Sequence, residues 1–131
     1  MKKIFVLLTL FTIASWINAQ EMDHSLDPVI KTIQEADAKG LAAFFNATVE
    51  LRLPDHENTY SSSQGEMIMK DFFKKYPPDS MTIIQQGNTD PSSRFAICNY
   101  LSGNTQYQLY LYLKKETDQF LINKIKFEEK K

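Results

Sequence analysis

Few side chains in this sequence are suited to act as a catalytic base or nucleophile. Proton abstraction beside a carbonyl group requires a carboxylate or a histidine whose pKa is shifted by its surroundings. His24 and His56 fall in a polar leader and in a predicted turn, where side chains are usually solvated. Asp37 is the best carboxylate candidate because it ends the first predicted helix, although an aspartate there more often caps the following helix. Cys98 has no neighbouring base in the pattern, and we interpret it as a small buried apolar residue.

A ligand pocket is the second kind of site that the residue types allow. Tyr100 and Tyr107 are expected to face each other on the inner side of a sheet and could line the mouth of a pocket; tyrosines at the edge of a core with solvated hydroxyls would give the same pattern. Asn123 is a polar residue on the same predicted face, and a buried amide needs partners from the protein or from a ligand. With Cys98, these residues form the predicted pocket lining. No metal-ligand spacing or glycine-rich phosphate loop is present, so we predict no metal site and no cofactor.

The strands that position these residues lie in the last third of the chain. From 94 to 127 the apolar residues recur at every second position, which is the period of a strand. Gly103 and Asn104 suit a two-residue hairpin loop. A three-residue loop over 116–118 is predicted next, because it places the apolar residues of the last strand beside those of the strand before it. With a further strand over 81–86, a four-stranded antiparallel meander is predicted. Its inner face is expected to hold Ala96, Cys98, Tyr100, Tyr107, Leu109, Leu111, Leu113, Leu121, Asn123, Ile125 and Phe127.

The other side of this meander, the outer face, carries an apolar and aromatic patch that no remaining segment is available to cover. Large exposed apolar patches usually mark contact surfaces. Two copies of the chain that meet there would form a homodimer. The residues of the predicted patch are Phe95, Ile97, Tyr110, Tyr112 and Ile122.

The first part of the chain is predicted to supply helices that cover the inner face. Asp27 and Pro28 open a helix with a buried stripe, and 41–45 is expected to form a second, short helix. Two strands follow, over 48–53 and 59–61. Ser63 and Glu66 then match a capping box. The helix that they begin runs to about residue 76, where two prolines stop it.

Composition indicates one ordinary globular domain. The sequence has 131 residues, with 15 Lys and Arg against 16 Asp and Glu, and no basic cluster that would imply nucleic acid or an acidic membrane. Lys2, Lys3 and the apolar run that follows are typical of a signal peptide, so we expect export to the periplasm or the medium, with no membrane contact after cleavage. We predict a signal peptide (1–19), a polar leader (20–25), a single α+β domain (26–128) and a charged tail (129–131). The single cysteine rules out an intrachain disulfide.

The predicted order is helix, short helix, two strands, helix and four strands. Together with the helix over 64–78, which carries Phe72-Phe73-Lys74-Lys75 and closes on Pro77-Pro78, and with the tyrosine-rich strand over 107–115, it resembles a family of uncharacterised small exported bacterial proteins. That family is similar to the nuclear transport factor two-like, or cystatin-like, superfamily, and the resemblance spans 26–128. It implies an α+β cone: helices packed on a bent, mostly antiparallel six-stranded sheet, with a cavity at the open end and the 48–53 strand beside the last strand.

Three functions are compatible with these observations. The first, which we prefer, is a non-catalytic exported domain that binds a small apolar or amphipathic ligand, or another chain, through the cone. The second is a lyase or isomerase with Asp37 as base and Tyr100 or Tyr107 as donor. The third is a structural module that forms a homodimer through the outer face. The superfamily includes enzymes such as ketosteroid isomerase as well as binding and assembly domains, so the fold alone does not decide among the three.

Overall fold

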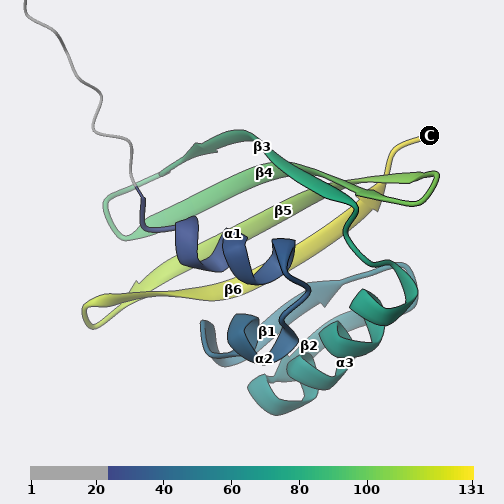
Figure 1. Cartoon of the computed structure of the whole chain (residues 1–131). Coiled ribbons are helices and arrows are strands. Elements are labelled where there is room, and N and C mark those ends of the chain that lie inside the picture. The colour runs from purple at the N-terminus through teal and green to yellow at the C-terminus, as the bar shows by residue number, and fades with distance from the viewer. Residues whose placement is uncertain (1–23) are drawn as a thin grey trace, which may run out of the picture.

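The computed structural model describes residues 24–131; the predicted signal peptide and most of the predicted leader lie outside the described residues. In this part of the chain, three helices lie on one side of a six-stranded sheet with the strand order β2-β1-β6-β5-β4-β3 (Figure 1). The side toward the helices is the inner face, and the opposite side is the outer face. In chain order the elements are α1 (Asp27–Gln34), α2 (Ala38–Ala42), β1 (Phe45–Arg52), β2 (Glu57–Ser61), α3 (Ser62–Lys75), β3 (Ser80–Gly87), β4 (Ser93–Ser102), β5 (Thr105–Glu116) and β6 (Gln119–Glu129).

The hairpin between β4 and β5 has the predicted register. Ser102 lies opposite Thr105, and Tyr100 lies opposite Tyr107. Gly103 adopts a φ of 58°, in the left-handed region that glycine enters at little cost. The two-residue loop therefore fixes which side chains of both strands face the helices.

The junction between β5 and β6 differs from the prediction. The loop has two residues, since Glu116 pairs with Gln119, and β6 contains a bulge that leaves Asn123 as an extra residue. The bulge lies between the pairs Leu113–Ile122 and Tyr112–Lys124. Because an extra residue reverses the alternation of side chains, the inner face of β6 is correctly predicted beyond the bulge and wrongly predicted before it.

The helices form where their apolar spacing predicts, with shifted boundaries. The buried stripe of α1 consists of Val29, Ile30 and Ile33, and α2 begins three residues earlier in the sequence than the predicted helix. The capping box of α3 is made by Ser61 and Gln64, not by the predicted Ser63 and Glu66. Within residues 24–131, none of the helices is both long and apolar enough to cross a membrane.

Strand β1 joins the early part of the chain to the meander. It lies beside β6, as the family resemblance implied, and runs parallel to β6 and antiparallel to β2. Strand β6 continues through Glu129, and the Lys130 N–H donates a hydrogen bond to the carbonyl of Gln106. The predicted charged tail at 129–131 therefore begins as a continuation of the sheet.

Helix α3 approaches β1 closely at Gly65. A Cβ atom at this position would lie 2.9 Å from Cγ1 of Val49 and 3.1 Å from Cε2 of Phe45. Both neighbours are buried and have little room to move. Glycine is therefore required here by packing against the strand.

We expect Gly65→Val to lower the free energy of unfolding by about 1–3 kcal/mol, because the new side chain overpacks the contact between α3 and β1. Chemical denaturation followed by circular dichroism measures the loss. Lys70→Val is the matched control, since it places the same residue on the exposed side of the same helix and should cost only helix propensity, less than about 0.7 kcal/mol. Equal losses in the two variants would contradict the packing argument.

Candidate functional site

The interior in which the sequence placed a ligand pocket is filled by aromatic rings. Phe72 of α3 packs against Phe127 with ring centres 4.4 Å apart and against Tyr76 at 5.3 Å. Tyr100 and Tyr107 complete this arrangement at 6.0 and 6.2 Å from Phe72. We call Phe72, Tyr76, Tyr100, Tyr107 and Phe127 the aromatic cluster. It joins α3 to β4, β5 and β6 where an open cone would leave space.

Three of the four predicted pocket residues are part of this packed core. Cys98 and Tyr100 are 0% exposed, and Tyr107 is 2% exposed. Side chains with so little accessible surface have no water-sized space beside them. The structure therefore places these residues in the core and leaves no open cavity between them for a ligand.

The polar groups of these three residues are held in their neutral forms. Burial raises the pKa of the Cys98 thiol to about 12, so the thiolate that a nucleophile requires is not formed at neutral pH. Burial likewise raises the pKa of Tyr107 to about 12, and it holds the pKa of Tyr100 well above its usual range. The Tyr100 hydroxyl donates a hydrogen bond to the backbone carbonyl of Tyr76. Its role is therefore to tie β4 to the end of α3.

The catalytic arrangement predicted for Asp37 is not formed. Asp37 is exposed and is the N-cap of α2, where its carboxylate accepts a hydrogen bond of 2.9 Å from the backbone N–H of Gly40. A base paired with Tyr100 or Tyr107 would have to point into the interior. The capping interpretation is the one that the structure bears out.

Asn123 and Ile122 have exchanged the positions predicted for them. Asn123, the fourth predicted pocket residue, is the bulged residue of β6, and its side-chain oxygen accepts a hydrogen bond of 3.1 Å from Asn46. Ile122, which was assigned to the outer patch, is 0% exposed and belongs to the core. The cause is the bulge: it moves one residue out of the inner face and brings its neighbour in.

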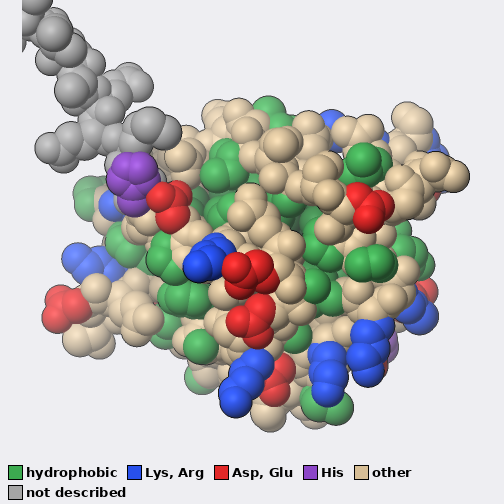
Figure 2. Space-filling model, viewed as in Figure 1, with side chains coloured by type: hydrophobic (Ala, Val, Ile, Leu, Met, Phe, Trp, Pro, Cys, Tyr) green, Lys and Arg blue, Asp and Glu red, His purple; other side chains and the backbone are tan. Residues whose placement is uncertain are grey.

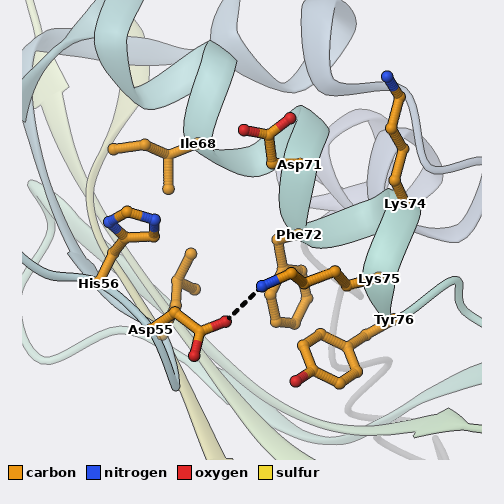
Figure 3. A pocket seen from close by; sticks show the side chains of 9 residues that line it. Asp55, His56, Ile68, Asp71, Phe72, Lys74, Lys75 and Tyr76 are labelled. Atoms are coloured by element: carbon orange, nitrogen blue, oxygen red, sulfur yellow. Dashed lines mark hydrogen bonds and ion pairs between the residues drawn. The ribbon is translucent and has the colours of Figure 1, made fainter.

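An open recess lies beside the aromatic cluster, between the β1–β2 turn and α3 (Figure 3). Its volume is about 310 Å³. The floor is apolar and the rim is charged, and an ion pair of 3.0 Å between Lys75 and Asp55 joins the two walls. The hydrogen bond from Lys75 to Asp55 raises the pKa of the lysine. The residues that line the recess are Leu53, Asp55, His56, Ile68, Asp71, Phe72, Lys74, Lys75 and Tyr76.

No pattern in the sequence predicted this recess. His56 falls in a predicted solvated turn, and both His56 and the neighbouring Asp55 are exposed. Asp71 of α3 is also exposed. What brings these residues together is the angle at which the β1–β2 hairpin meets the helix. That angle follows from packing and has no counterpart in a linear pattern.

A second groove crosses the outer face over β4, β5 and β6, with a volume of about 320 Å³. Phe95 lies opposite Tyr112 and Ile97 lies opposite Tyr110, and all four side chains are half-buried. The edge of the groove toward β6 is basic, because Lys124 and Lys126 also line it. The side chains of both lysines thus lie on the outer face.

Metal binding has no candidate within residues 24–131: no three side chains of His, Cys, Asp or Glu converge there in a way that could hold an ion. The two histidines lie in different parts of the structure. His24 bonds to Asp27 at the start of α1 through a contact of 2.6 Å, whereas His56 lies on the rim of the recess.

The model of the domain of unknown function DUF4783 matches residues 26–128, most of the chain. The chain belongs to this family. A DUF4783 protein of Bacteroides uniformis has a similar solved structure, with 20% identity and a TM-score of 0.75 over 80% of this chain and 96% of the other. No curated protein matches the chain.

Two further solved structures resemble this DUF4783 domain. A Shewanella baltica protein described as NTF2-like and of unknown function is 11% identical, with a TM-score of 0.60 over 82% of this chain and 93% of the other. A Xanthomonas campestris protein described as a candidate calcium/calmodulin dependent protein kinase II association domain is 13% identical, with a TM-score of 0.64 over 82% and 84%.

The fold of the DUF4783 domain is therefore NTF2-like, the abbreviated name of the nuclear transport factor two-like fold. It combines helices with a mixed, mostly antiparallel six-stranded sheet in the described part of the chain. The superfamily resemblance inferred from the sequence is confirmed. Likenesses at this level of identity establish the fold, whereas function has to be argued from the site.

Proposed function

We propose that this DUF4783 domain is a non-catalytic association module, in which two copies of the chain bind each other through the outer faces of their sheets. The observation that supports this is the aromatic groove on the outer face, which none of the described helices covers. Export, inferred from residues 1–19, remains part of the proposal. Binding inside the cone, our preferred hypothesis from the sequence, loses its support because the aromatic cluster fills the interior.

The apolar part of the outer face has the composition of a contact surface. Its four half-exposed residues, Phe95, Ile97, Tyr110 and Tyr112, lie on two neighbouring strands and form one continuous patch. Interface centres are enriched in aromatic residues, which bury much surface at a low cost in conformational entropy. The groove between these side chains would allow side chains of a second copy to insert.

The charged part of the outer face is compatible with a second copy. Lys124 lies 3.9 Å from Glu50, Arg52 lies 2.9 Å from the same carboxylate, and Lys126 lies 3.6 Å from Glu128. Since these charges are paired within the chain, two identical faces can approach without bringing unpaired like charges together. In a two-fold arrangement with the β5 strands at the centre, the lysine side of one copy would cover the β4 side of the other. The alkyl stems of the lysines can pack on apolar surface there.

One structural relative agrees with this proposal. The Xanthomonas campestris protein with the same fold is described as a candidate association domain. The likeness suggests that this fold is suited to assembly, and the outer face of this chain provides the residues that would form the contact. The two lines of support are independent of each other.

The association is tested by light scattering over a range of protein concentrations. We expect the unmodified protein to reach twice the mass of one chain. Ile97→Glu and Tyr110→Glu should each raise the dissociation constant at least roughly 30-fold, as expected for hot-spot residues at an interface. Both positions are half-exposed, so the variants should still fold.

The control for this experiment is Met67→Glu. Met67 of α3 is apolar and 59% exposed. It lies on the side of the molecule that carries the helices, where acidic and basic side chains are mixed on the surface (Figure 2). The same charge introduced there should leave the association unchanged. A single-chain mass at every concentration, or equal weakening by all three variants, would overturn the proposal.

A further inference from the structure

The recess between the β1–β2 turn and α3 is separate from the outer face and has features of a small-molecule site. We propose that it binds a small aromatic carboxylate, with the ring on the apolar floor and the acid group between Lys75 and His56. This site does not depend on association of two copies. The argument rests on the floor, the rim and the distribution of charge between the two walls.

The floor of the recess is apolar and backed by rigid packing. Leu53 and Phe72 are 7% and 5% exposed, while Ile68 and Tyr76 are half-buried. Phe72 and Tyr76 belong to the aromatic cluster, so the surface that a ligand would meet is supported from behind by close ring contacts. Ligand sites in proteins are usually preformed, mostly apolar and at least about 300 Å³ in volume. A volume of about 310 Å³ therefore suits a ligand built on one ring.

The rim favours an anion. The Lys75 ammonium extends from α3 toward the wall that carries Asp55 and His56, whereas Lys74 and Asp71 point away from Lys75 (Figure 3). Lys75 gives one hydrogen bond to Asp55 at 3.0 Å, and an ammonium group has three donors. Two donors of Lys75 therefore remain for a ligand. The His56 side chain forms no hydrogen bond within residues 24–131, and its ring meets the Tyr60 ring edge-on with centres 6.5 Å apart.

Asp55 supplies a test of the sign of the ligand charge. Its carboxylate competes with an acidic ligand for Lys75, and it would attract a basic ligand. Removal of this charge should therefore strengthen the binding of an anion and weaken the binding of a cation. In a recess that binds its ligand through apolar contacts alone, removal of the Asp55 charge would change neither the binding of an anion nor the binding of a cation.

Three probes of nearly equal shape separate these alternatives: 3-phenylpropionate, 3-phenylpropanamide and 3-phenylpropylamine. Binding is measured by titration of amide resonances in NMR spectra of the purified protein and of its Ile97→Glu variant, so that failure of association does not affect the result. We expect the carboxylate to bind about threefold to fivefold more tightly than the amide, the range for one partly exposed ion pair. The amine should bind most weakly.

The variants Lys75→Gln and Asp55→Asn should act in opposite directions on 3-phenylpropionate. Lys75→Gln is expected to weaken its binding about threefold to fivefold, and Asp55→Asn to strengthen it by a similar factor. Lys70→Gln, an exposed position on the same helix, should change it less than twofold. All three positions are exposed, so folding is not at risk.

Shifts confined to residues of the recess, with the carboxylate preferred and the two variants opposed, support the proposal. It is overturned if the amide or the amine binds as tightly as the acid. An equal effect of Lys75→Gln and Lys70→Gln also overturns it, as does the absence of any saturable shift at the recess. None of these outcomes depends on the mass measured for the outer-face variants.

Discussion

Phe72→Ala is expected to lower the free energy of unfolding by about 3–5 kcal/mol, the usual cost of replacing a buried phenylalanine with alanine. Phe72 is the centre of the aromatic cluster: its ring lies 4.4 Å from Phe127 and about 6 Å from Tyr100 and Tyr107. It is the residue through which α3 contacts the ring-bearing positions of β4, β5 and β6. The expected loss is a large share of the total stability of a domain of this size.

Urea denaturation followed by circular dichroism measures the loss. Met67→Ala on the exposed side of α3 is the matched control and should change stability by less than about 0.5 kcal/mol. Phe72→Leu retains most of the apolar volume and should lie between the two. A loss for Phe72→Ala as small as that of the control would mean that the interior is not packed as described, and the case against a ligand inside the cone would fail with it.

The sequence predicts the filled interior only in part. The inner-face positions of Tyr100, Tyr107 and Phe127 follow from the alternation of the strands, and Phe72 lies on the sheet side of its helix by spacing. Four large rings on facing surfaces carry enough volume to close a small cone. Alternation, however, predicts which way a side chain points and not how far it lies from the side chains opposite. Whether rings meet or leave a gap depends on how far the helix stands from the sheet.

Elements with one dominant local signal were predicted well. Gly103 predicted the register of the β4–β5 hairpin without error, and the prolines at 77 and 78 predicted the end of α3 to within one residue. Boundaries with competing signals were predicted less accurately. Both Ser61 and Ser63 stand three residues before a Gln or Glu, so the spacing fits two capping boxes, and the helix uses the earlier one.

The candidate sites show the same division. The outer patch was predicted from alternation, and four of its five residues are on the outer face as expected. The recess was not predicted, because its two walls are separated in sequence and meet only through the angle between the β1–β2 hairpin and α3. Asp55 and Lys75 form an ion pair across 20 positions of the chain, and no spacing rule connects them.

The register of β6 was predicted wrongly because three consecutive apolar residues lie at its start. Phe120, Leu121 and Ile122 satisfy either parity, so alternation could not decide which of them faces the helices. The prediction extended the parity of Ile125 backwards without a break and placed Leu121 inside. The two-residue loop and the bulge at Asn123 place Ile122 there instead.

Ile122→Ala is therefore expected to lower the free energy of unfolding by about 2–5 kcal/mol, because it leaves a cavity at a position that is 0% exposed. Leu121→Ala removes a side chain of the same size from a half-exposed position beside it and should cost markedly less. Thermal and urea denaturation of both variants measure the difference. The register without a bulge requires the opposite order, since it buries Leu121 and exposes Ile122. A larger loss for Leu121→Ala would thus return Asn123 to the inner face and Ile122 to the outer patch, and the association surface would have to be redrawn to include it.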